Sequence, residues 1–120
     1  ILNKAVDEFC RQNQDRSKAF FSLGLKRYLS AMKYARVVVG NSSSGVVETP
    51  AFGTPTVNIG DRQKGRFIAE NVICTGTDKA DIARGILERL RYPSGVIRDV
   101  TTLIRIAGCP LSYNQRSFKL

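Results

Sequence analysis

The stretch RVVVGNSSSGVVETPAFGTPTVNI, residues 36–59, decides the fold class of this chain. Its three consecutive valines end at Gly40, which predicts a strand buried on both faces and therefore a parallel strand. A second strand is expected at Thr56–Ile59, after Gly53 has ended a helical segment. Because proline in a helix interior costs about 3 kcal/mol, Pro50 predicts that the helix between the two strands is short or kinked.

The flanking sequence alternates helical and strand patterns. Leu25, Leu29 and Met32 are expected to share the apolar face of one helix, and Asp78 is expected to cap another in which Gly85 is a local weakness. Residues 100–108, VTTLIRIAG, fit either a strand or a helix. The alternation predicts a doubly wound α/β fold, a Rossmann-like parallel sheet with flanking helices. The other expected elements are helices at 3–14, 25–35 and 79–92 and a strand at 71–75.

Length and composition bound the class of protein. The 120 residues are enough for one compact domain, and we expect a Rossmann-like domain at residues 1–92 followed by a tail of uncertain structure at residues 93–120. No apolar run approaches a membrane span, and the first residues lack a signal-peptide layout, so a cytoplasmic protein without a membrane partner is expected. Because the first residues already have a helical pattern, we also expect the chain to be part of a longer protein.

Charge and cysteine content restrict the possible ligands. The net charge of +9 is spread along the chain, so we expect non-specific attraction to polyanions but no dedicated nucleic-acid partner. A binding site for a smaller anion, such as a nucleotide diphosphate, would need only a few of these positive side chains. Three separated cysteines and no histidine predict reduced thiols and no metal site.

The serine-rich turn after the first strand is the main candidate for anion binding. Neither a Walker A loop nor a G-x-G-x-x-G fingerprint is present. A strand that ends in glycine, followed by small hydroxyl residues and a helix start, nevertheless offers N–H and O–H donors to a phosphate. Ser42, Ser43 and Ser44 supply hydroxyls, and Gly45 allows close approach of the backbone. The alternative is that one serine only caps the helix.

Five further residues are candidates for contacts with a nucleotide. The ionised carboxylate of Glu48 can accept both hydroxyls of a ribose, or it can merely interact with the helix dipole. Arg62, Lys64 and Arg66 follow the second strand at the carboxyl edge of the sheet and can offset a diphosphate, although a basic loop is often only a solvated surface. Tyr28 can stack on a base or pack in the core.

Three segments together resemble the hydrolysing UDP-N-acetylglucosamine 2-epimerases: SLGLKRYLSAMKYA, VVVGNSSSGVVETPAFGTPTVNIGDRQKGR and ENVI. The resemblance runs from about residue 22 to 73, with a family-like helix up to Arg91. It implies the C-terminal half of a two-domain fold of the glycosyltransferase-B type, with a UDP-sugar bound between the domains. The tail at residues 93–120 departs from the glycine-rich ending usual in the family.

The resemblance also implies roles for individual residues. Ser42 and Ser43 look like diphosphate contacts supported by the backbone of Ser44 and Gly45, and Glu48 looks like the acceptor for the ribose diol. Tyr28 corresponds to an aromatic residue that packs against uracil, and Arg62 to a basic contact near the nucleotide.

In this family, UDP leaves UDP-N-acetylglucosamine and water adds with inversion at C2, giving N-acetylmannosamine for sialic-acid and related pathways. The carboxylates and the histidine for this chemistry would lie outside this chain, so we expect no catalytic residue here and no turnover by the isolated chain. The resemblance implies a missing N-terminal domain as partner, a homo-oligomeric parent and no cofactor. Three alternatives stay open: a 2-epimerase acting on UDP-2,4-diacetamido-trideoxyglucose, a UDP-sugar glycosyltransferase of the same fold, and a basic polyanion-binding module.

Overall fold

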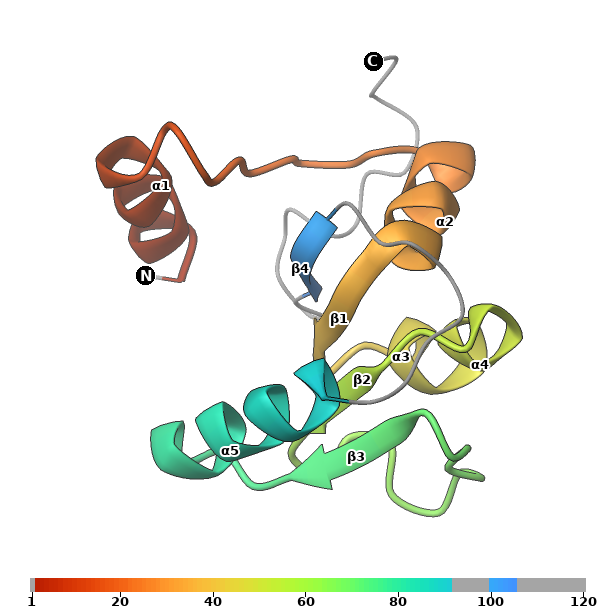
Figure 1. Cartoon of the computed structure of the whole chain (residues 1–120). Coiled ribbons are helices and arrows are strands. Elements are labelled where there is room, and N and C mark those ends of the chain that lie inside the picture. Colours follow the sequence, from red (N-terminus) through yellow and green to blue (C-terminus); the bar gives the residue numbers. More distant parts are fainter. Residues whose placement is uncertain (1, 92–99, 106–120) are drawn as a thin grey trace. The chain divides into compact units, whose positions relative to one another are not determined.

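The computed structural model describes residues 2–91 and 100–105 (Figure 1). By their contacts, the described residues fall into two units, residues 2–27 and residues 28–91 with 100–105, and each unit is described by itself. Within the described ranges, no helix is long and apolar enough to cross a bilayer.

The second unit contains a parallel sheet in the order β3-β2-β1-β4. Each neighbouring pair is parallel, with Val38 of β1 opposite Thr56 of β2 and Leu103 of β4, and with Thr56 opposite Val72 of β3. The prediction of parallel strands is confirmed, and the segment that fitted either a strand or a helix begins with a strand. The strands are β1 (Ala35–Gly40), β2 (Thr56–Ile59), β3 (Val72–Thr75) and β4 (Val100–Arg105).

The sheet order places a topological switch point beside β1. The chain proceeds from β1 through β2 to β3 in one direction, whereas β4 lies on the other side of β1. In open α/β sheets, ligands bind outside the carboxyl ends of the strands at such a point. The loop that leaves β1 therefore occupies a position typical of a binding site.

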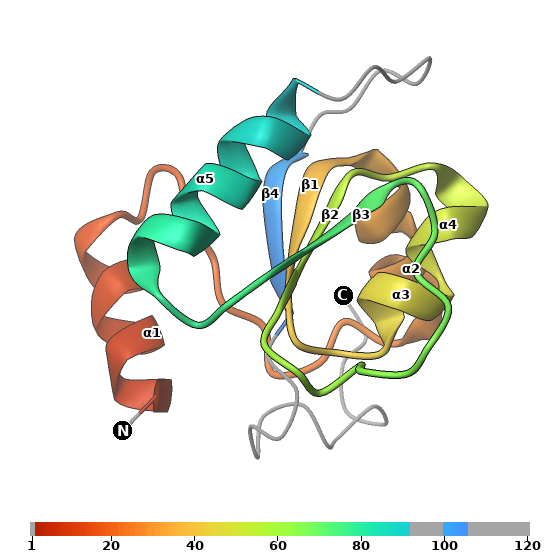
Figure 2. The ribbon, with the colours of Figure 1, turned by 90° about the horizontal axis from the view of Figure 1, so that it is seen from below.

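Helices cover both faces of the sheet (Figure 2). On one face, Val37, Val39 and Val57 form a buried cluster against α5 (Lys79–Leu90). On the other face, Met32 and Val38 belong to a second cluster. Leu29 from α2 (Leu25–Tyr34) and Phe52 from α4 (Thr49–Phe52) pack against this cluster. The valines of β1 alternate between the two clusters. Consecutive apolar residues are therefore required, because both faces of this strand are buried. The doubly wound fold expected from the sequence is confirmed.

The segment between β1 and β2 forms two one-turn helices, α3 (Ser44–Val47) and α4 (Thr49–Phe52), with a break at Glu48. Pro50 lies in the first turn of α4, where its missing N–H is not needed. Gly53 ends α4 with φ of 61°, a left-handed conformation that glycine adopts readily. The expectation of a short or kinked helix is confirmed as a split helix.

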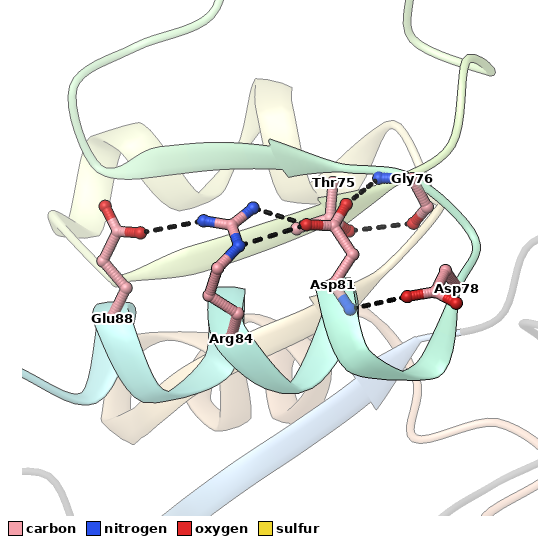
Figure 3. A network of polar contacts seen from close by, with 6 residues as sticks. All are labelled: Thr75, Gly76, Asp78, Asp81, Arg84 and Glu88. Atoms are coloured by element: carbon pink, nitrogen blue, oxygen red, sulfur yellow. Dashed lines mark hydrogen bonds and ion pairs between the residues drawn. The ribbon is translucent and has the colours of Figure 1, made fainter.

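The start of α5 is fixed by a polar network that ties it to the end of β3 (Figure 3). The Asp78 side chain caps the helix by accepting a hydrogen bond from the backbone N–H of Asp81 at 3.0 Å, as the sequence predicted. The Asp81 carboxylate accepts hydrogen bonds from the Arg84 guanidinium and from the Gly76 N–H. The Arg84 guanidinium, together with the Gly76 N–H, lowers the pKa of the Asp81 carboxyl below its ordinary value. Arg84 also donates to Glu88 at 3.4 Å.

Both N-terminal helices are present, but one detail of their expected packing is wrong. In the first unit, α1 (Leu2–Gln12) carries an ion pair between Arg11 and Glu8. The next helix, α2 (Leu25–Tyr34), buries Met32 completely, whereas Leu25 is 70% exposed. The core contact of α2 therefore comes from its C-terminal part, and Leu25 does not share the buried face as predicted.

The domain boundary expected at residue 92 stays a prediction, because residues 92–99 and 106–120 lie outside the described residues. The described part of the expected tail is β4, which pairs with β1 along five positions from Ala35 to Gly40. This part of the tail therefore belongs to the sheet.

Candidate functional site

Two loops at the carboxyl edge of the sheet form the candidate site. Gly40, the last residue of β1, stands opposite Asn58 of β2 in the parallel register. The loops that follow these strands must therefore leave the sheet at the same edge. The first is the serine turn, which we define as residues 41–44, and the second is the basic loop, residues 61–66.

A hollow of about 410 Å³, open to solvent, lies between the two loops. Its lining combines side chains from the serine turn with side chains from the basic loop, although these lie about twenty residues apart in the sequence. The structure thus brings together three of the predicted site residues and one additional predicted cation, Arg66. The lining residues are Ser42, Ser43, Arg62, Gln63 and Arg66.

The serine turn uses some of its polar groups internally and leaves others available. The Ser42 hydroxyl accepts a hydrogen bond from the backbone N–H of Ser44 at 3.3 Å and donates to the Ser44 hydroxyl at 3.4 Å. Ser43 is the N-cap of α3, but its side chain makes no capping hydrogen bond. Capping therefore does not account for the Ser43 hydroxyl, which lies in the exposed wall of the hollow.

Gly45 has a packing role at the base of the turn. It is buried, and a Cβ on it would lie 3.2 Å from Cγ2 of Thr56 in β2. The absence of a side chain therefore lets α3 lie close to the sheet. Since α3 is only one turn long, its dipole is small, and the attraction for an anion rests mainly on the hydroxyls and guanidinium groups.

Glu48 stands at the break between α3 and α4. Its backbone N–H donates to the backbone carbonyl oxygen of Ser44 at 3.1 Å, while its side chain makes no capping hydrogen bond. Its Oε2 atom is buried and has no hydrogen-bond partner among the residues that the structure describes. A buried carboxylate oxygen without a donor is unusual and points to a role outside the local fold. Glu48 is not among the residues that line the hollow.

A network of buried hydrogen bonds joins the α3–α4 segment to β2 and to the residue before β3. The Thr49 hydroxyl donates to the Gly45 oxygen at 2.7 Å and accepts from the side chains of Thr56 at 2.9 Å and Asn71 at 3.1 Å. Asn71 also donates to the Thr54 oxygen at 2.7 Å. These bonds hold the α3–α4 segment in a fixed position on β2, so that Glu48 projects from a rigid base.

Sequence reasoning missed Gln63. This residue is only 4% exposed, although its neighbours Arg62 and Lys64 are exposed. Its amide nitrogen donates to the backbone oxygen of Asn41 at 3.2 Å and so joins the basic loop to the serine turn. The sequence carries no clear signal for this role, because glutamine in a basic loop is ordinary. Lys64, which was grouped with the two arginines, does not line the hollow.

Tyr28 lies on α2, partly buried against the cluster of Met32, Ala35 and Val38. This contact fits the alternative of a core aromatic residue, and Tyr28 does not line the hollow. Its stacking on a base stays a prediction.

Residues that could bind a metal ion are scattered in the described part of the chain. No group of three or more His, Cys, Asp and Glu residues lies together there. Cys10 and Cys74 are free thiols, and Cys109 is outside the described ranges.

A parallel α/β domain with hydroxyl and guanidinium groups gathered at the switch point has the arrangement expected of a phosphate- or nucleotide-binding site. Residues 2–99 match the UDP-N-acetylglucosamine 2-epimerase family. The chain therefore belongs to this family, and the resemblance seen in its motifs is confirmed.

Several curated proteins are similar to this chain. A Campylobacter jejuni GDP/UDP-N,N'-diacetylbacillosamine 2-epimerase (hydrolyzing) is 44% identical over 77% of this chain. The polysialic acid biosynthesis protein P7 of Escherichia coli is 41% identical over 72% of the chain. A Neisseria meningitidis UDP-N-acetylglucosamine 2-epimerase is 32% identical over 64% of it. The matched regions span only 24%, 22% and 20% of these relatives, so the chain corresponds to about a quarter of their length.

Proposed function

We propose that this chain supplies the nucleotide-binding part of a hydrolysing UDP-N-acetylglucosamine 2-epimerase, which converts UDP-N-acetylglucosamine and water to N-acetylmannosamine and UDP. The observation that supports this most is the hollow between the serine turn and the basic loop, lined by two serines, two arginines and Gln63. Its two guanidinium groups match the charge of a diphosphate, and the serine hydroxyls supply short donors.

Glu48 is proposed to accept the hydroxyl groups of the ribose. Its buried Oε2 has no donor in the described part of the fold, and an ionised carboxylate can accept two hydroxyl hydrogens. The break between α3 and α4 places this carboxylate one short helix away from the serines. The backbone of Ser44 and Gly45 is proposed to support the diphosphate contacts by holding the serine turn in shape, since their N–H groups donate to the hydroxyl and to the carbonyl oxygen of Ser42. Tyr28 is proposed to pack against uracil.

The remaining parts of the enzyme are proposed to come from outside this chain. The relatives are about four times longer than the matched region, which supports a further domain that carries the catalytic carboxylates and histidine. We accordingly propose that the isolated chain binds UDP without turning over substrate. The parent enzyme is proposed to be a cytoplasmic homo-oligomer that produces N-acetylmannosamine for sialic-acid synthesis.

A second candidate is a 2-epimerase that acts on a diacetamido sugar. Identity to the diacetylbacillosamine enzyme, 44%, exceeds the 32% to the N-acetylglucosamine enzyme. Both candidates share the nucleotide site and differ only in the sugar. Comparing the affinities for UDP-N-acetylglucosamine and for UDP-2,4-diacetamido-trideoxyglucose would separate them.

Calorimetric titration of the chain with UDP and with ADP tests the proposed nucleotide site. The diphosphates are identical, so a pocket for uridine predicts tighter binding of UDP, whereas a basic surface would bind both equally. A polyanion-binding module would further show binding to RNA that weakens steeply with salt, by about one unit of logarithmic slope per phosphate contacted. Equal affinities for UDP and ADP would contradict the proposal.

A further inference from the structure

The side-chain amide of Gln63 has an orientation that its surroundings determine. The backbone oxygen of Asn41, 3.2 Å away, can only accept a hydrogen bond. The amide nitrogen must therefore face Asn41, and the amide oxygen must lie on the other side of the group. This removes the usual ambiguity between the two ends of a glutamine side chain.

The amide oxygen of Gln63 is a buried hydrogen-bond acceptor beside a hollow whose other side chains can all donate hydrogen bonds. It has no hydrogen-bond partner among the described residues, although the residue as a whole is only 4% exposed. The other side chains that line the hollow are serines and arginines. Guanidinium groups only donate, and serine hydroxyls both donate and accept. Gln63 therefore adds a carbonyl acceptor to a site otherwise suited to phosphate oxygens.

We propose that Gln63 is a ligand-binding residue, whose amide oxygen accepts a hydrogen bond from a hydroxyl or N–H group of the bound nucleotide sugar. The phosphate oxygens of a nucleotide sugar cannot fill this role, because both phosphates are ionised diesters at neutral pH and their oxygens only accept hydrogen bonds. The donor must therefore belong to the nucleoside or to the sugar. The inference rests on the proposed function, since it places a nucleotide sugar in the hollow.

A buried carbonyl that gains a donor on binding favours ligands that carry this donor over ligands that lack it. Inorganic pyrophosphate has the same P–O–P group as the diphosphate but neither a nucleoside nor a sugar. The ratio of affinities for UDP or UDP-N-acetylglucosamine and for pyrophosphate therefore measures contacts to the nucleoside and the sugar. Gln63 is proposed to make one of these contacts.

Two substitutions separate this role from the link to Asn41. Gln63→Met keeps the approximate length and removes both the donor and the acceptor. Gln63→Lys keeps a donor that can reach Asn41, removes the acceptor and adds a positive charge. The matched control is Gln14→Met, at an exposed position of the first unit. Thermal unfolding of each variant would establish that it is folded at the titration temperature.

Dissociation constants for pyrophosphate, UDP and UDP-N-acetylglucosamine would be measured calorimetrically. In both Gln63 variants we expect the selectivity over pyrophosphate to fall about tenfold, the size typical of a buried hydrogen bond that loses one partner. In Gln63→Lys we also expect tighter binding of pyrophosphate, because the added charge attracts it. A loss for both nucleotides would assign the donor to the nucleoside, and a loss for UDP-N-acetylglucosamine alone would assign it to the sugar.

Equal weakening of all three ligands, or unchanged affinities, would overturn the inference, because Gln63 would then only hold the loops or have no part in binding. The proposed function would survive that result as long as the unsubstituted chain prefers UDP to ADP. If the unsubstituted chain shows no such preference, the proposed function itself fails and the inference fails with it.

Discussion

Gly85 of α5 lies so close to the end of β3 that a Cβ on it would stand 2.7 Å from Cγ2 of Thr75. The same Cβ would lie 3.3 Å from Cγ1 of Val57 in β2. Glycine at this position therefore permits the close packing of α5 on the sheet. Its cost to helix propensity, which made it look like a weakness in the sequence, is offset by this contact.

Gly85→Ala is expected to destabilise the fold. Overpacking a core contact typically costs about 1 to 3 kcal/mol, and the better helix propensity of alanine returns about 1 kcal/mol, so we expect a net loss of about 1 kcal/mol. Chemical denaturation would measure it. Adding Thr75→Ser, which removes Cγ2 but keeps the hydroxyl that donates to the Gly76 oxygen, should recover part of the loss. A more stable Gly85→Ala chain would show that the packing is looser than described.

Asp81 is expected to make the fold sensitive to acid. Its pKa is lowered in the folded chain, first by Arg84 and then by the Gly76 N–H. The unfolded chain therefore binds the proton more readily, and the stability that Asp81 contributes is present above its ordinary pKa of about 3.9 and is lost as the pH falls through the lowered value.

Thermal unfolding of the chain and of Asp81→Asn between neutral and acidic pH tests this contribution. The variant should be less stable at neutral pH and should lose less stability on acidification than the unsubstituted chain. Asp15→Asn, at an exposed position of the first unit, is the matched control and should keep the original pH profile. Parallel profiles for the chain and for Asp81→Asn would contradict the assignment.

Glu48→Gln is expected to weaken recognition of the ribose without unfolding the chain. Removing the negative charge weakens hydrogen bonds to hydroxyls, and hydrogen bonds to charged groups contribute about 1.5 to 3 kcal/mol. We therefore expect the preference for UDP over 2′-deoxy-UDP to fall by about tenfold. Glu70→Gln, at an exposed glutamate, is the control and should leave the preference unchanged. An undiminished preference in Glu48→Gln would assign the diol contact to another group.

The cations of the basic loop are expected to differ in their effect on UDP binding. Arg62 and Arg66 line the hollow, whereas Lys64 does not. Arg66→Ala should therefore weaken UDP binding about tenfold, the size of one lost charge-assisted hydrogen bond, and Lys64→Ala should change it by less than about twofold. Both variants remove one charge from the same loop, so any long-range electrostatic effect is matched. Equal losses of affinity would indicate general attraction to a basic surface.

Local patterns in the sequence account for much of the fold. The valine run of β1, the strand at Thr56–Ile59, the Asp78 cap and the end of a helix at Gly53 were all predicted, because each depends on residues that are close in sequence. Pro50 likewise predicted that the helix between the two strands is short or kinked, and the structure has two one-turn helices there.

Features that depend on distant contacts were not predictable. The segment 100–108 fitted either a strand or a helix, and pairing with β1 determines that its residues 100–105 form β4. The exposure of Leu25 and the packing of Gly85 likewise depend on which neighbours the fold provides. At the site, the serines and Arg62 were recognisable from their chemistry, but the burial of Gln63 arises from its contact with Asn41.

The most direct test of the nucleotide site is an amide NMR titration of the isotope-labelled chain with UDP. The account predicts that the largest shifts fall in the serine turn, at Glu48 and in the basic loop, while α1 and the exposed face of α5 stay unchanged. Shifts distributed over cationic residues throughout the chain, or none in these two loops, would contradict the claim that the hollow at the carboxyl edge of the sheet binds the nucleotide.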